Sequence, residues 1–591
     1  MCGIFGYAGT HTSAPEIVLE GLKSLEYRGY DSWGVAAVPQ TGKKIIVKKK
    51  AGKIGNAKVA DLPAATLAFG HTRWATHGGV TDENAHPHLD CSGNIAVIHN
   101  GIFENYEEVK KKLLSKGHRF VSETDTEVIA HLLEEYTARG MMFSKAVQKT
   151  FNEMEGLNAI IAINTNTGQM IAARNGSPLV VGFGHKENYL ASDAAALLPH
   201  TKQVHFLEDN EMAIVGPGAI MLFNAKTGER VQPRKQQLNW TMEEAEKGKY
   251  PFFMLKEIHE QPGLISEIAG ESSAQAKKMA ETLRKAHGAY IVGCGTSAHA
   301  SMAAAYLFSR IAKRHVNWAI GSEFAYQMEF LQPKSAVLAI SQSGETMDIL
   351  ESIKKAKEKK AAILGLVNVV GSSLWRTSDL ALPIGVGPEK GVASTKAFTG
   401  QLAHLLLLAY AMDGRTKEGQ RVVTKAAKIA RSMFKAEQIN RIKDLAKKLK
   451  DVEHMYVVGR GLSYPASLET ALKVKEISYI HAEGFAAGEL KHGVIALIEK
   501  GTPCVVFAPN DETYGANLAG AMEMKARGGY IIGISHKNAD VFDTFIPVAD
   551  AGHASIIPNV IVGQLLAYYL TIERGLDPDM PRNLAKSVTV K

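Results

Sequence analysis

Short hydrophobic runs separated by turn-forming residues characterise the chain up to about Met221. The runs at 67–70, 95–99, 159–164 and 170–174 have the length of strands, and clusters of Gly, Asn and Thr lie between them. This pattern predicts a sheet-rich, antiparallel region.

One helix is indicated among these strands, at 125–136. Ser122 or Thr124 can cap its start, because a hydroxyl oxygen can accept from the free N–H groups of a first turn. Its apolar side is formed by four residues at helical spacing: Val128, Ile129, Leu132 and Leu133.

The pattern changes after a polar stretch at 231–250, which predicts a linker. Beyond it, strand-length hydrophobic runs alternate with longer helical runs, as in a parallel sheet covered by helices. The segments 289–297 and 455–463 both have the pattern of a strand, a Gly-rich turn and a helix start, and they are 166 residues apart. Second strands follow at 336–340 and 504–508. This self-similarity predicts two tandem α/β domains.

Composition places the chain among globular multidomain proteins. Of its 591 residues 46% are hydrophobic and 22% are charged, which excludes a disordered or fibrous chain. The net charge of +8 is a mild excess over this length. The basic stretch at 43–58 contains no aromatic residue, so we expect a solvated surface and no nucleic-acid partner.

Two hydrophobic stretches, at 402–412 and 556–570, are interrupted by polar residues: His404 in the first, and Asn559 and Gln564 in the second. Neither reaches the length of uninterrupted apolar sequence that a membrane span requires. The start of the chain lacks the basic segment of a signal peptide. We therefore expect a soluble protein with no membrane partner.

Four cysteines are present: Cys2, Cys91, Cys294 and Cys504. They form no Cys-x-x-Cys pair, and no group of Cys and His has the sequence spacing of zinc ligands. We expect no disulfide framework, and hence a reducing, cytoplasmic location.

Cys2 becomes the amino terminus if the initiator methionine is removed. An α-amine with a pKa of about 7.7–8.0 is then close enough to take the thiol proton without a separate histidine base. A cysteine at this position more often has no function, so the neighbouring motifs decide between the two interpretations.

The motifs of the first region resemble the class II glutamine amidotransferases. The resemblance implies an amino-terminal-nucleophile αββα fold with Cys2 as the nucleophile. It is carried by four segments: Tyr27-Arg28-Gly29-Tyr30-Asp31-Ser32, His71-Thr72-Arg73-Trp74-Ala75-Thr76-His77-Gly78, His99-Asn100-Gly101 and Ser122-Glu123-Thr124-Asp125.

Within this resemblance the charged residues suit glutamine, which is a zwitterion. Arg73 would grip the α-carboxylate and Asp125 would pair with the α-ammonium group. The Asn100 side chain and the Gly101 N–H would stabilise the oxyanion formed during amide hydrolysis. The resemblance also assigns two neighbours to the glutamine site: His77, and Trp74 as the gate of the ammonia path.

The histidines at 71, 77, 86, 88 and 99 raise the alternative of a metal site. His86 and His88 lack helical spacing and a nearby carboxylate cluster. We therefore predict neither a metal ion nor a cofactor.

The segment 341–346, Ser-Gln-Ser-Gly-Glu-Thr, follows a hydrophobic strand and opens a helix. Hydroxyls and backbone N–H groups at a helix start form an anion site without a lysine. The Gly-Lys-Ser/Thr sequence of a nucleotide-binding loop is missing, so a small phosphate monoester fits better. A plain capping turn is an equally good interpretation of this motif alone.

With 294–297 before it and 392–396 after it, this segment resembles the sugar isomerase (SIS) domain. A glutaminase followed by two such domains is similar to the glutamine–fructose-6-phosphate aminotransferase (isomerizing) family, the glucosamine-6-phosphate synthases. The resemblance spans nearly the whole chain. It implies that phosphate is held by Ser297, Ser341, Gln342, Ser343 and Thr346, and that Val392 and Ser394 contact the sugar.

In the second repeat, the helix predicted at 467–480 carries Glu469, Lys473 and Glu476 on one face. For an unplaced helix, a solvated charge stripe is the simpler interpretation. The resemblance implies instead that Glu476 moves a proton between C1 and C2 of the sugar, with Lys473 beside it. Two further catalytic residues are implied: His492, which opens the sugar ring, and Lys586, which binds the open ketone as a Schiff base.

The resemblance implies conversion of fructose 6-phosphate and glutamine to glucosamine 6-phosphate and glutamate, by a homodimer in which a neighbouring subunit supplies the histidine that matches His492. We expect a glutaminase domain at 2–221, a linker at 222–252, SIS domains at 253–425 and 426–580, and an active-site tail at 581–591. Three residues depart from the family pattern: Trp33, Lys390 and Lys591.

Three alternatives remain at this point. A glutamine-dependent phosphoribosyl transferase would share the first domain but carry an acidic diphosphate-binding loop. A sugar-phosphate deglycase would share the SIS pair but lack the glutaminase. A non-catalytic sugar-phosphate sensor would not need Cys2, Glu476, His492 and Lys586 intact.

Overall fold

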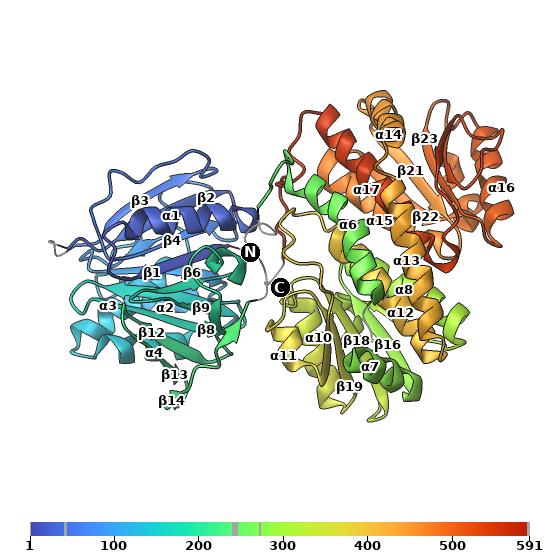
Figure 1. Ribbon diagram of the computed structural model, residues 1–591. Coiled ribbons are helices and arrows are strands. Elements are labelled where there is room, and N and C mark those ends of the chain that lie inside the picture. Colours follow the sequence, from blue (N-terminus) through green and yellow to red (C-terminus); the bar gives the residue numbers. More distant parts are fainter. Residues whose placement is uncertain (1, 41–43, 239–245, 271–272, 588–591) are drawn as a thin grey trace. The chain divides into compact units, whose positions relative to one another are not determined.

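The computed structural model describes residues 2–40, 44–238, 246–270 and 273–587 (Figure 1). The chain forms two compact units: residues up to Ala245 together with those from Ala585 on, and Glu246–Leu584. The predicted tail at 581–591 is thus divided between the two units, and Lys591 lies outside the described residues.

The described part of the first unit contains two antiparallel sheets. The eight-stranded sheet has the order β15-β11-β9-β10-β1-β4-β2-β3. Its strands are β1 (Gly3–Ala8), β2 (Ser32–Ala37), β3 (Ile46–Ala51), β4 (Leu67–Arg73), β9 (Val180–Phe183), β10 (Asn188–Ala191), β11 (Gln203–Phe206) and β15 (Gln236–Gln237).

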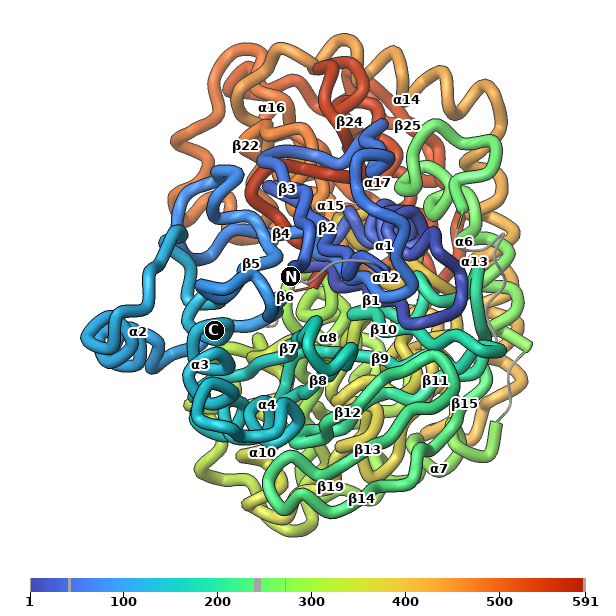
Figure 2. Tube along the Cα trace, turned by 90° about the vertical axis from the view of Figure 1, so that its left-hand side faces the viewer, coloured from blue at the N-terminus to red at the C-terminus, as the bar shows by residue number. Residues whose placement is uncertain are grey.

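The seven-stranded sheet has the order β14-β13-β12-β8-β7-β6-β5 among the described residues, and β12, β13 and β14 follow one another towards its edge (Figure 2). Its strands are β5 (His88–Leu89), β6 (Ile95–Gly101), β7 (Asn158–Asn164), β8 (Gln169–Asn175), β12 (Glu211–Val215), β13 (Ile220–Asn224) and β14 (Arg230–Val231).

Hydrophobic side chains arrange these sheets in an αββα order. Side chains of both sheets, such as Phe69 and Ile161, form the core between them. A second core lies under α1, and a third lies between the seven-stranded sheet and α3 and α4. The helices are α1 (Ala14–Leu25), α2 (Tyr106–Leu114), α3 (Thr126–Ala138) and α4 (Phe143–Glu153), with short 3-10 turns η1 (Glu26–Arg28) and η2 (Ala194–Leu197). The predicted fold class of this region is confirmed.

The polar segment predicted as a linker contributes strands to the first unit instead. Phe223 pairs with Arg230 in the seven-stranded sheet, and Gln203 pairs with Gln237 in the eight-stranded sheet. These strands are two residues long and polar, so they show no hydrophobic alternation. The expected linker of 222–252 therefore overlaps the first unit as far as Gln237.

The second unit contains two parallel sheets of the same design, each five-stranded among the described residues: β17-β16-β18-β19-β20 and β22-β21-β23-β24-β25. The first repeat has β16 (Gly288–Gly293), β17 (Asn317–Ile320), β18 (Ser335–Ser341), β19 (Ala362–Val367) and β20 (Leu380–Pro383). The second has β21 (His454–Gly459), β22 (His481–Ala486), β23 (Pro503–Ala508), β24 (Tyr530–Ser535) and β25 (Thr544–Pro547). The predicted tandem repeat is confirmed.

Helices cover both faces of these sheets, and one hydrophobic core runs through both repeats, from Met254 to Leu570. This shared core explains why the two repeats form one compact unit. The helices are α6 (Phe253–Gly270), α7 (Ala274–Lys285), α8 (Thr296–Ala312), α9 (Gly321–Phe324), α10 (Met347–Glu358), α11 (Ser373–Thr377), α12 (Lys396–Met412), α13 (Thr416–Ser432), α14 (Ala436–Leu449), α15 (Ser463–Ser478), α16 (Tyr514–Lys525) and α17 (Ile556–Glu573), with 3-10 turns η3 (Ala487–His492), η4 (Val494–Leu497) and η5 (Gly552–Ala554).

Matching glycines end the first strand of each repeat. A Cβ at Gly293 would collide with the carbonyl oxygen of Ser297, and a Cβ at Gly459 with that of Ser463. Only glycine lets the following helix start this close to the strand. The turns that begin α8 and α15 are therefore tight in both repeats.

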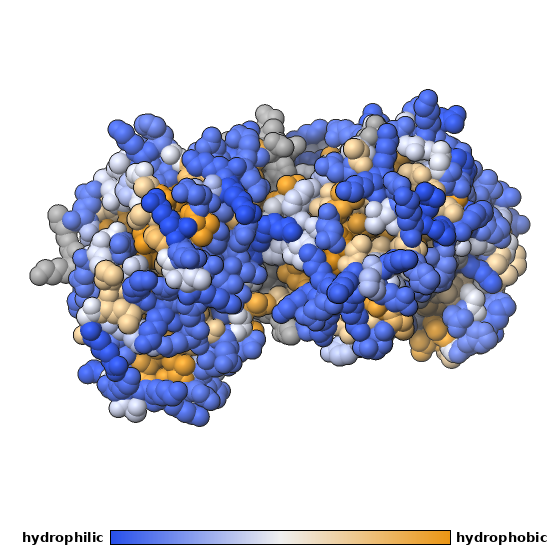
Figure 3. Space-filling model, turned by 90° about the horizontal axis from the view of Figure 1, so that it is seen from below, coloured by the Kyte–Doolittle hydropathy of each residue, from blue (hydrophilic) through white to orange (hydrophobic). Residues whose placement is uncertain are grey.

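The segment Gly552–Glu573, which includes α17, is long and apolar enough to cross a membrane, but 89% of that stretch is buried inside the unit. Its buried Gln564 accepts a hydrogen bond from Gln261 at 2.7 Å. These observations describe a core helix. In the view of Figure 3 hydrophilic residues predominate, and hydrophobic side chains form separate patches.

Candidate active site

Cys2 lies at the edge of the first unit's central strands. It immediately precedes β1, which pairs with β4 so that Gly3 lies opposite Thr72. The end of β4 is therefore beside the thiol, and the backbone N–H of Trp74 donates to Cys2 Sγ at 3.2 Å. Burial raises the pKa of the Cys2 thiol above its ordinary value, while the positive amino terminus and the Trp74 N–H act to lower it. The thiol therefore needs a base when it reacts.

Asn100 and Gly101 end β6 next to Cys2. The Asn100 Nδ2 donates to the carbonyl oxygen of Cys2 at 2.9 Å, and its Oδ1 lies 3.0 Å from His71 Nε2. His71 thus turns the amide N–H groups towards Cys2. Gly101 has a φ of +133°, and a Cβ there would collide with the carbonyl oxygen of Leu157. The geometry brings three predicted residues, Cys2, Asn100 and Gly101, together.

Arg73 and Asp125 are both buried in the same region. The Arg73 guanidinium donates to the carbonyl oxygens of Gly79 (3.0 Å), Gly78 (3.2 Å) and His77, and so holds that loop. Burial lowers the pKa of Arg73, while the nearby Cys2 and Asp125 act to raise it. Asp125 accepts the Phe103 N–H at 2.8 Å. A cation and an anion therefore lie near the thiol, as a zwitterionic substrate needs.

Of the five histidines at 71, 77, 86, 88 and 99, four are buried, and three of these pack against one another. His71 and His86 stack at 4.2 Å, and burial lowers the pKa of both, that of His71 to about 3. Burial also lowers the pKa of His88 and of His99. These four side chains are consequently neutral at physiological pH. His77 is half-buried, with its ring edge-on to Tyr106 at 5.6 Å.

The segment 341–346 of the second unit links β18 to α10. Ser341 Oγ accepts the Gly344 N–H at 2.9 Å and lies 3.4 Å from Thr346 Oγ1, and Ser343 Oγ accepts the Glu345 N–H at 3.2 Å. The loop therefore gathers hydroxyls at the start of a twelve-residue helix, where anions are favoured.

Ser297 lies in the first turn of α8, and its Oγ accepts from Gln401 Nε2 at 3.0 Å. The neighbouring Thr296 contacts the second repeat: its Oγ1 donates to Glu469 Oε1 at 3.1 Å and accepts from Lys473 Nζ at 3.2 Å. Lys473 Nζ also donates to Glu476 Oε2 at 2.5 Å. The fold thus joins a helix start of one repeat to the charged helix face of the other.

The predicted charge stripe on α15 is not a solvated surface. The side chains of Lys473 and Glu469 are each 1% exposed, and that of Glu476 is 21% exposed. Burial acts to lower the pKa of Lys473, but the carboxylates of Glu476 and Glu469 hold it above its ordinary value. Lys473 is therefore an ammonium ion shared between two acids. His299 Nδ1 lies 2.8 Å from Glu469 Oε2 and completes the cluster.

The loop before α12 holds two other predicted residues. The Val392 N–H donates to the Asp579 carbonyl at 3.2 Å. Ser394 Oγ donates to Glu389 Oε2 at 3.0 Å, and Glu389 Oε1 also accepts the Thr395 N–H at 2.9 Å. Glu389 thus fixes this loop at the helix start.

Three predicted residues are not joined to this cluster. Gln342 is half-buried in the loop, and His492 ends η3 with an exposed side chain that makes no hydrogen bond to another described residue. Lys586 belongs to the first compact unit, whereas the cluster lies in the second.

The comparisons with known proteins match both kinds of predicted domain. The glutamine amidotransferase domain family matches residues 71–199, and the SIS domain family matches 282–411 and 448–573. The chain is 43% identical over its whole length to the full-length glutamine–fructose-6-phosphate aminotransferase [isomerizing] of Pyrococcus horikoshii, and 41% identical to that of Thermus thermophilus, again with both chains fully covered.

The chain belongs to the glutamine–fructose-6-phosphate aminotransferase (isomerizing) family. A solved structure of the carboxy-terminal domain of the Francisella tularensis glucosamine-fructose-6-phosphate aminotransferase, at 37% identity, covers 56% of this chain and 99% of its own, with a TM-score of 0.52. It supports the fold of the second unit.

Several residues of the cluster formed by α8, α12 and α15 have no role predicted from the sequence. Thr296 and Glu469 stood within predicted motifs, next to Ser297 and one turn before Lys473. His299 and Gln401 carried no signal, because only the packing of α8 against α15 and α12 brings them in. Two departures from the family pattern are buried: Trp33 in the core of the first unit, and Lys390, whose ammonium lies 5.2 Å from the centre of the Phe253 ring.

Proposed function

We propose that this chain converts D-fructose 6-phosphate and glutamine to D-glucosamine 6-phosphate and glutamate, as the first step of the hexosamine pathway towards UDP-N-acetylglucosamine. The full-length relatives support this reaction. The observation that supports the proposal is the contact of the buried Lys473 with both Glu476 and Thr296, because an acid–base group beside hydroxyls suits a sugar-phosphate substrate.

In the first half-reaction, Cys2 attacks the amide carbon of glutamine while the freed α-amine takes the thiol proton. The oxyanion receives N–H groups from Asn100 and Gly101. Ammonia leaves, and water hydrolyses the resulting glutamyl thioester to glutamate. Arg73 and Asp125 hold the two charges of the substrate.

In the second half-reaction, His492 opens the sugar ring and Lys586 forms a Schiff base at C2. Ammonia displaces the lysine at C2, and Glu476 moves one proton from C1 to C2. The product is an aldose with an amine at C2. Because ammonium has no free electron pair, the ammonia must travel enclosed, with Trp74 as the gate.

The test is the formation of glucosamine 6-phosphate from glutamine and fructose 6-phosphate by the purified chain. Cys2→Ala should abolish glutamine-dependent synthesis, whereas Cys504→Ala should retain it. Glu476→Gln should abolish synthesis but leave glutamine hydrolysis, and the exposed Glu483→Gln is its matched control. Synthesis at the wild-type rate by Cys2→Ala or Glu476→Gln would refute the assigned role.

We further propose a cytoplasmic homodimer. Free cysteines suit a reducing compartment. The exposed His492 is available to a second copy, whose sugar site it would complete. Chains carrying Glu476→Gln and chains carrying His492→Ala should then be inactive alone and, when co-expressed, recover about a quarter of wild-type activity, because random two-fold pairing restores one site in each mixed dimer. A monodisperse active monomer, or no recovery in verified mixed dimers, would contradict the shared site.

A further inference from the structure

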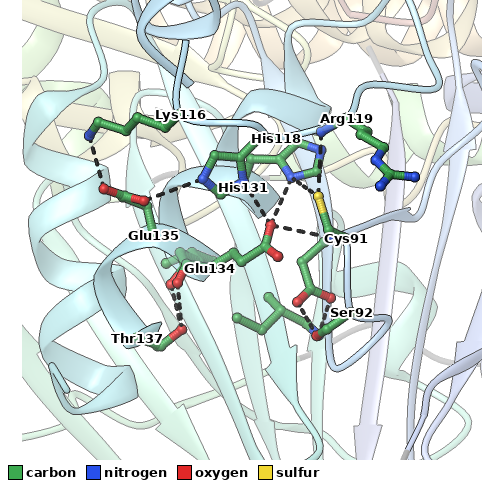
Figure 4. Close-up of polar contacts among 12 residues, drawn as sticks. Cys91, Ser92, Lys116, His118, Arg119, His131, Glu134, Glu135 and Thr137 are labelled. Atoms are coloured by element: carbon green, nitrogen blue, oxygen red, sulfur yellow. Dashed lines mark hydrogen bonds and ion pairs between the residues drawn. The ribbon is translucent and has the colours of Figure 1, made fainter. Parts of the chain in front are cut away.

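Four side chains with metal-binding atoms converge beside α3 in the first unit (Figure 4). Cys91 comes from the turn between β5 and β6, His118 from the loop between α2 and α3, and His131 and Glu134 from α3 itself. The candidate ligand atoms of all four lie within 4.8 Å of one another. None of these residues belongs to the glutamine site proposed above.

The distances suit one small cation. Glu134 Oε2 lies 2.9 Å from His118 Nδ1 and 3.0 Å from His131 Nδ1, and Cys91 Sγ lies 3.6 Å from His131 Nδ1. Tetrahedral zinc, with bonds of about 2.0–2.3 Å, needs ligand atoms about 3.3–3.7 Å apart. These three separations need shifts of a few tenths of an ångström, and the widest separation in the cluster, up to 4.8 Å, would have to shorten by about an ångström to admit the ion.

The groups beside the second ring nitrogen of each histidine provide an independent observation that favours a metal site. Each histidine has Nδ1 towards the centre and Nε2 towards a carboxylate: His118 Nε2 is hydrogen-bonded to Glu135 Oε2 at 3.4 Å, and His131 Nε2 lies 3.7 Å from Glu127 Oε1, within ion-pair range but beyond a hydrogen bond. Histidine ligands of metal ions usually have such a partner on the other ring nitrogen, because it fixes the tautomer and ring orientation.

The contact made by Cys91 Sγ also supports its role as a metal ligand. Cys91 Sγ accepts the Arg119 N–H at 3.4 Å, which would stabilise a thiolate. The Phe120 ring lies edge-on to His131 at 4.5 Å and shields one side of the cluster. The side chain of His131 is 1% exposed, and those of His118 and Glu134 are 10% and 20% exposed.

We propose that Cys91, His118, His131 and Glu134 bind one zinc ion as a structural site. A thiolate, two imidazoles and one carboxylate match zinc better than magnesium or calcium, which prefer oxygen ligands alone. Four protein ligands leave no position open for substrate. Zinc-ligand spacing in a sequence reveals only ligands that lie close together in the chain, whereas these four come from three separate segments.

The site would fasten the loop that carries Asp125. Glu127, which faces His131, also accepts the N–H groups of Val121 (2.8 Å) and Ser122 (2.7 Å) and the Ser122 hydroxyl (2.7 Å). The chain reaches Asp125 three residues after Ser122. Loss of zinc should therefore raise the KM for glutamine at least fivefold and change the kcat of hydrolysis less.

The alternative to a bound metal ion is a set of ion pairs between protonated histidines and the neighbouring carboxylates. Doubly protonated His118 and His131 could pair with Glu127, Glu134 and Glu135 without a metal ion. The two interpretations differ in metal content, which can be measured directly.

The full-length chain, purified without chelator or metal-affinity tag, equilibrated with a small excess of zinc and then desalted, should hold about one zinc per chain by elemental analysis. Cys91→Ala and His131→Ala should each lose at least four-fifths of it. Two matched controls should retain it: Cys504→Ala, and His185→Ala on the exposed surface. Wild-type zinc content no higher than that of Cys91→Ala would overturn the proposal.

A measurement on the wild-type chain covers the case in which the variants fail to fold. Cobalt added to the zinc-free chain should give a thiolate-to-cobalt charge-transfer band and strong tetrahedral visible bands. Zinc in stoichiometric amount should remove them and raise the melting temperature of the first unit. Weak octahedral bands without charge transfer, or no thermal shift with zinc, would support the ion-pair interpretation and refute the site.

Discussion

At the residue scale, the chemistry at Cys2 depends on how one amide is oriented. Asn100 could present either its oxygen or its NH₂ group to the reacting carbonyl. His71 Nε2, 3.0 Å from both Asn100 Oδ1 and the His99 carbonyl oxygen, must donate to these acceptors, since neither can donate itself. The NH₂ group is thereby left on the side of Cys2, where an oxyanion would form.

Asn100→Ala should therefore lower the kcat of glutamine hydrolysis about 10²–10³-fold, the usual cost of losing one oxyanion donor. The KM for glutamine and the affinity for fructose 6-phosphate should change little. Steady-state hydrolysis assays measure the effect, with Asn94→Ala, in the turn before β6, as the control. A fall of less than tenfold would remove Asn100 from the oxyanion site.

The same histidine makes the first unit sensitive to acid. Burial lowers the folded-state pKa of His71 to about 3, so between pH 6.5 and 3 the unfolded chain binds the extra proton. Stability from neutral His71 is thus complete above its unfolded pKa and is lost as the pH falls. From pH 7 to 5 this loss is about 2 kcal/mol.

His71→Gln keeps an N–H donor but cannot titrate, so its free energy of unfolding should fall about 2 kcal/mol less between pH 7 and 5 than that of the wild type. Urea unfolding of the first unit, followed at both pH values, measures this difference. His185→Gln should behave as the wild type. An unchanged pH dependence in His71→Gln would mean that His71 is protonated in the folded state.

At the element scale, the two SIS repeats share a fold but differ in the loop after the third strand, β18 in the first repeat and β23 in the second. The first repeat has hydroxyls at 341–346, whereas in the second repeat Asp511 and Glu512 line a pocket together with Ser463. Carboxylates repel phosphate, although Arg310 pairs with Glu512. We therefore expect one phosphate site rather than two in the repeated fold.

Calorimetric titration should accordingly show one fructose 6-phosphate per chain. Ser297→Ala should weaken binding at least tenfold, because a hydroxyl bonded to a charged group contributes about 1.5–3 kcal/mol. Ser463→Ala, the matched residue of the second repeat, should leave the affinity within twofold. Two equivalent sites, or equal effects of the two substitutions, would contradict this asymmetry.

The elements also show what sequence can and cannot predict. The strand-turn-helix units at Gly293 and Gly459 were predictable because local sterics require glycine there. The strands at 230–231 and 236–237 were not, since each is only two residues long and shows no hydrophobic alternation, and the second pairs with backbone more than 30 residues away. The contacts of Thr296 with Lys473 and of Cys91 with His131 likewise arise only when segments far apart in sequence pack together.

At the scale of the whole molecule, the two units have separate hydrophobic cores. A ligand that binds only one unit should stabilise only that unit. In Lys586→Ala, which removes the proposed bond between the sugar and the first unit, fructose 6-phosphate at about 100 times its dissociation constant should add about 2.7 kcal/mol to the unit 246–584. Calorimetry should therefore show two unfolding transitions, and the sugar should raise the melting temperature of only one of them. A single transition, or an equal rise of both, would contradict separate units.

The central claim is that one chain passes nitrogen from glutamine at Cys2 to the sugar beside Glu476. Its most direct test supplies amide-¹⁵N-glutamine and fructose 6-phosphate together with unlabelled ammonium, and measures the isotope in the product by mass spectrometry. We predict glucosamine 6-phosphate that carries ¹⁵N, formed in step with glutamate and absent with Cys2→Ala. Unlabelled product, or glutamate without amino sugar, would contradict the account.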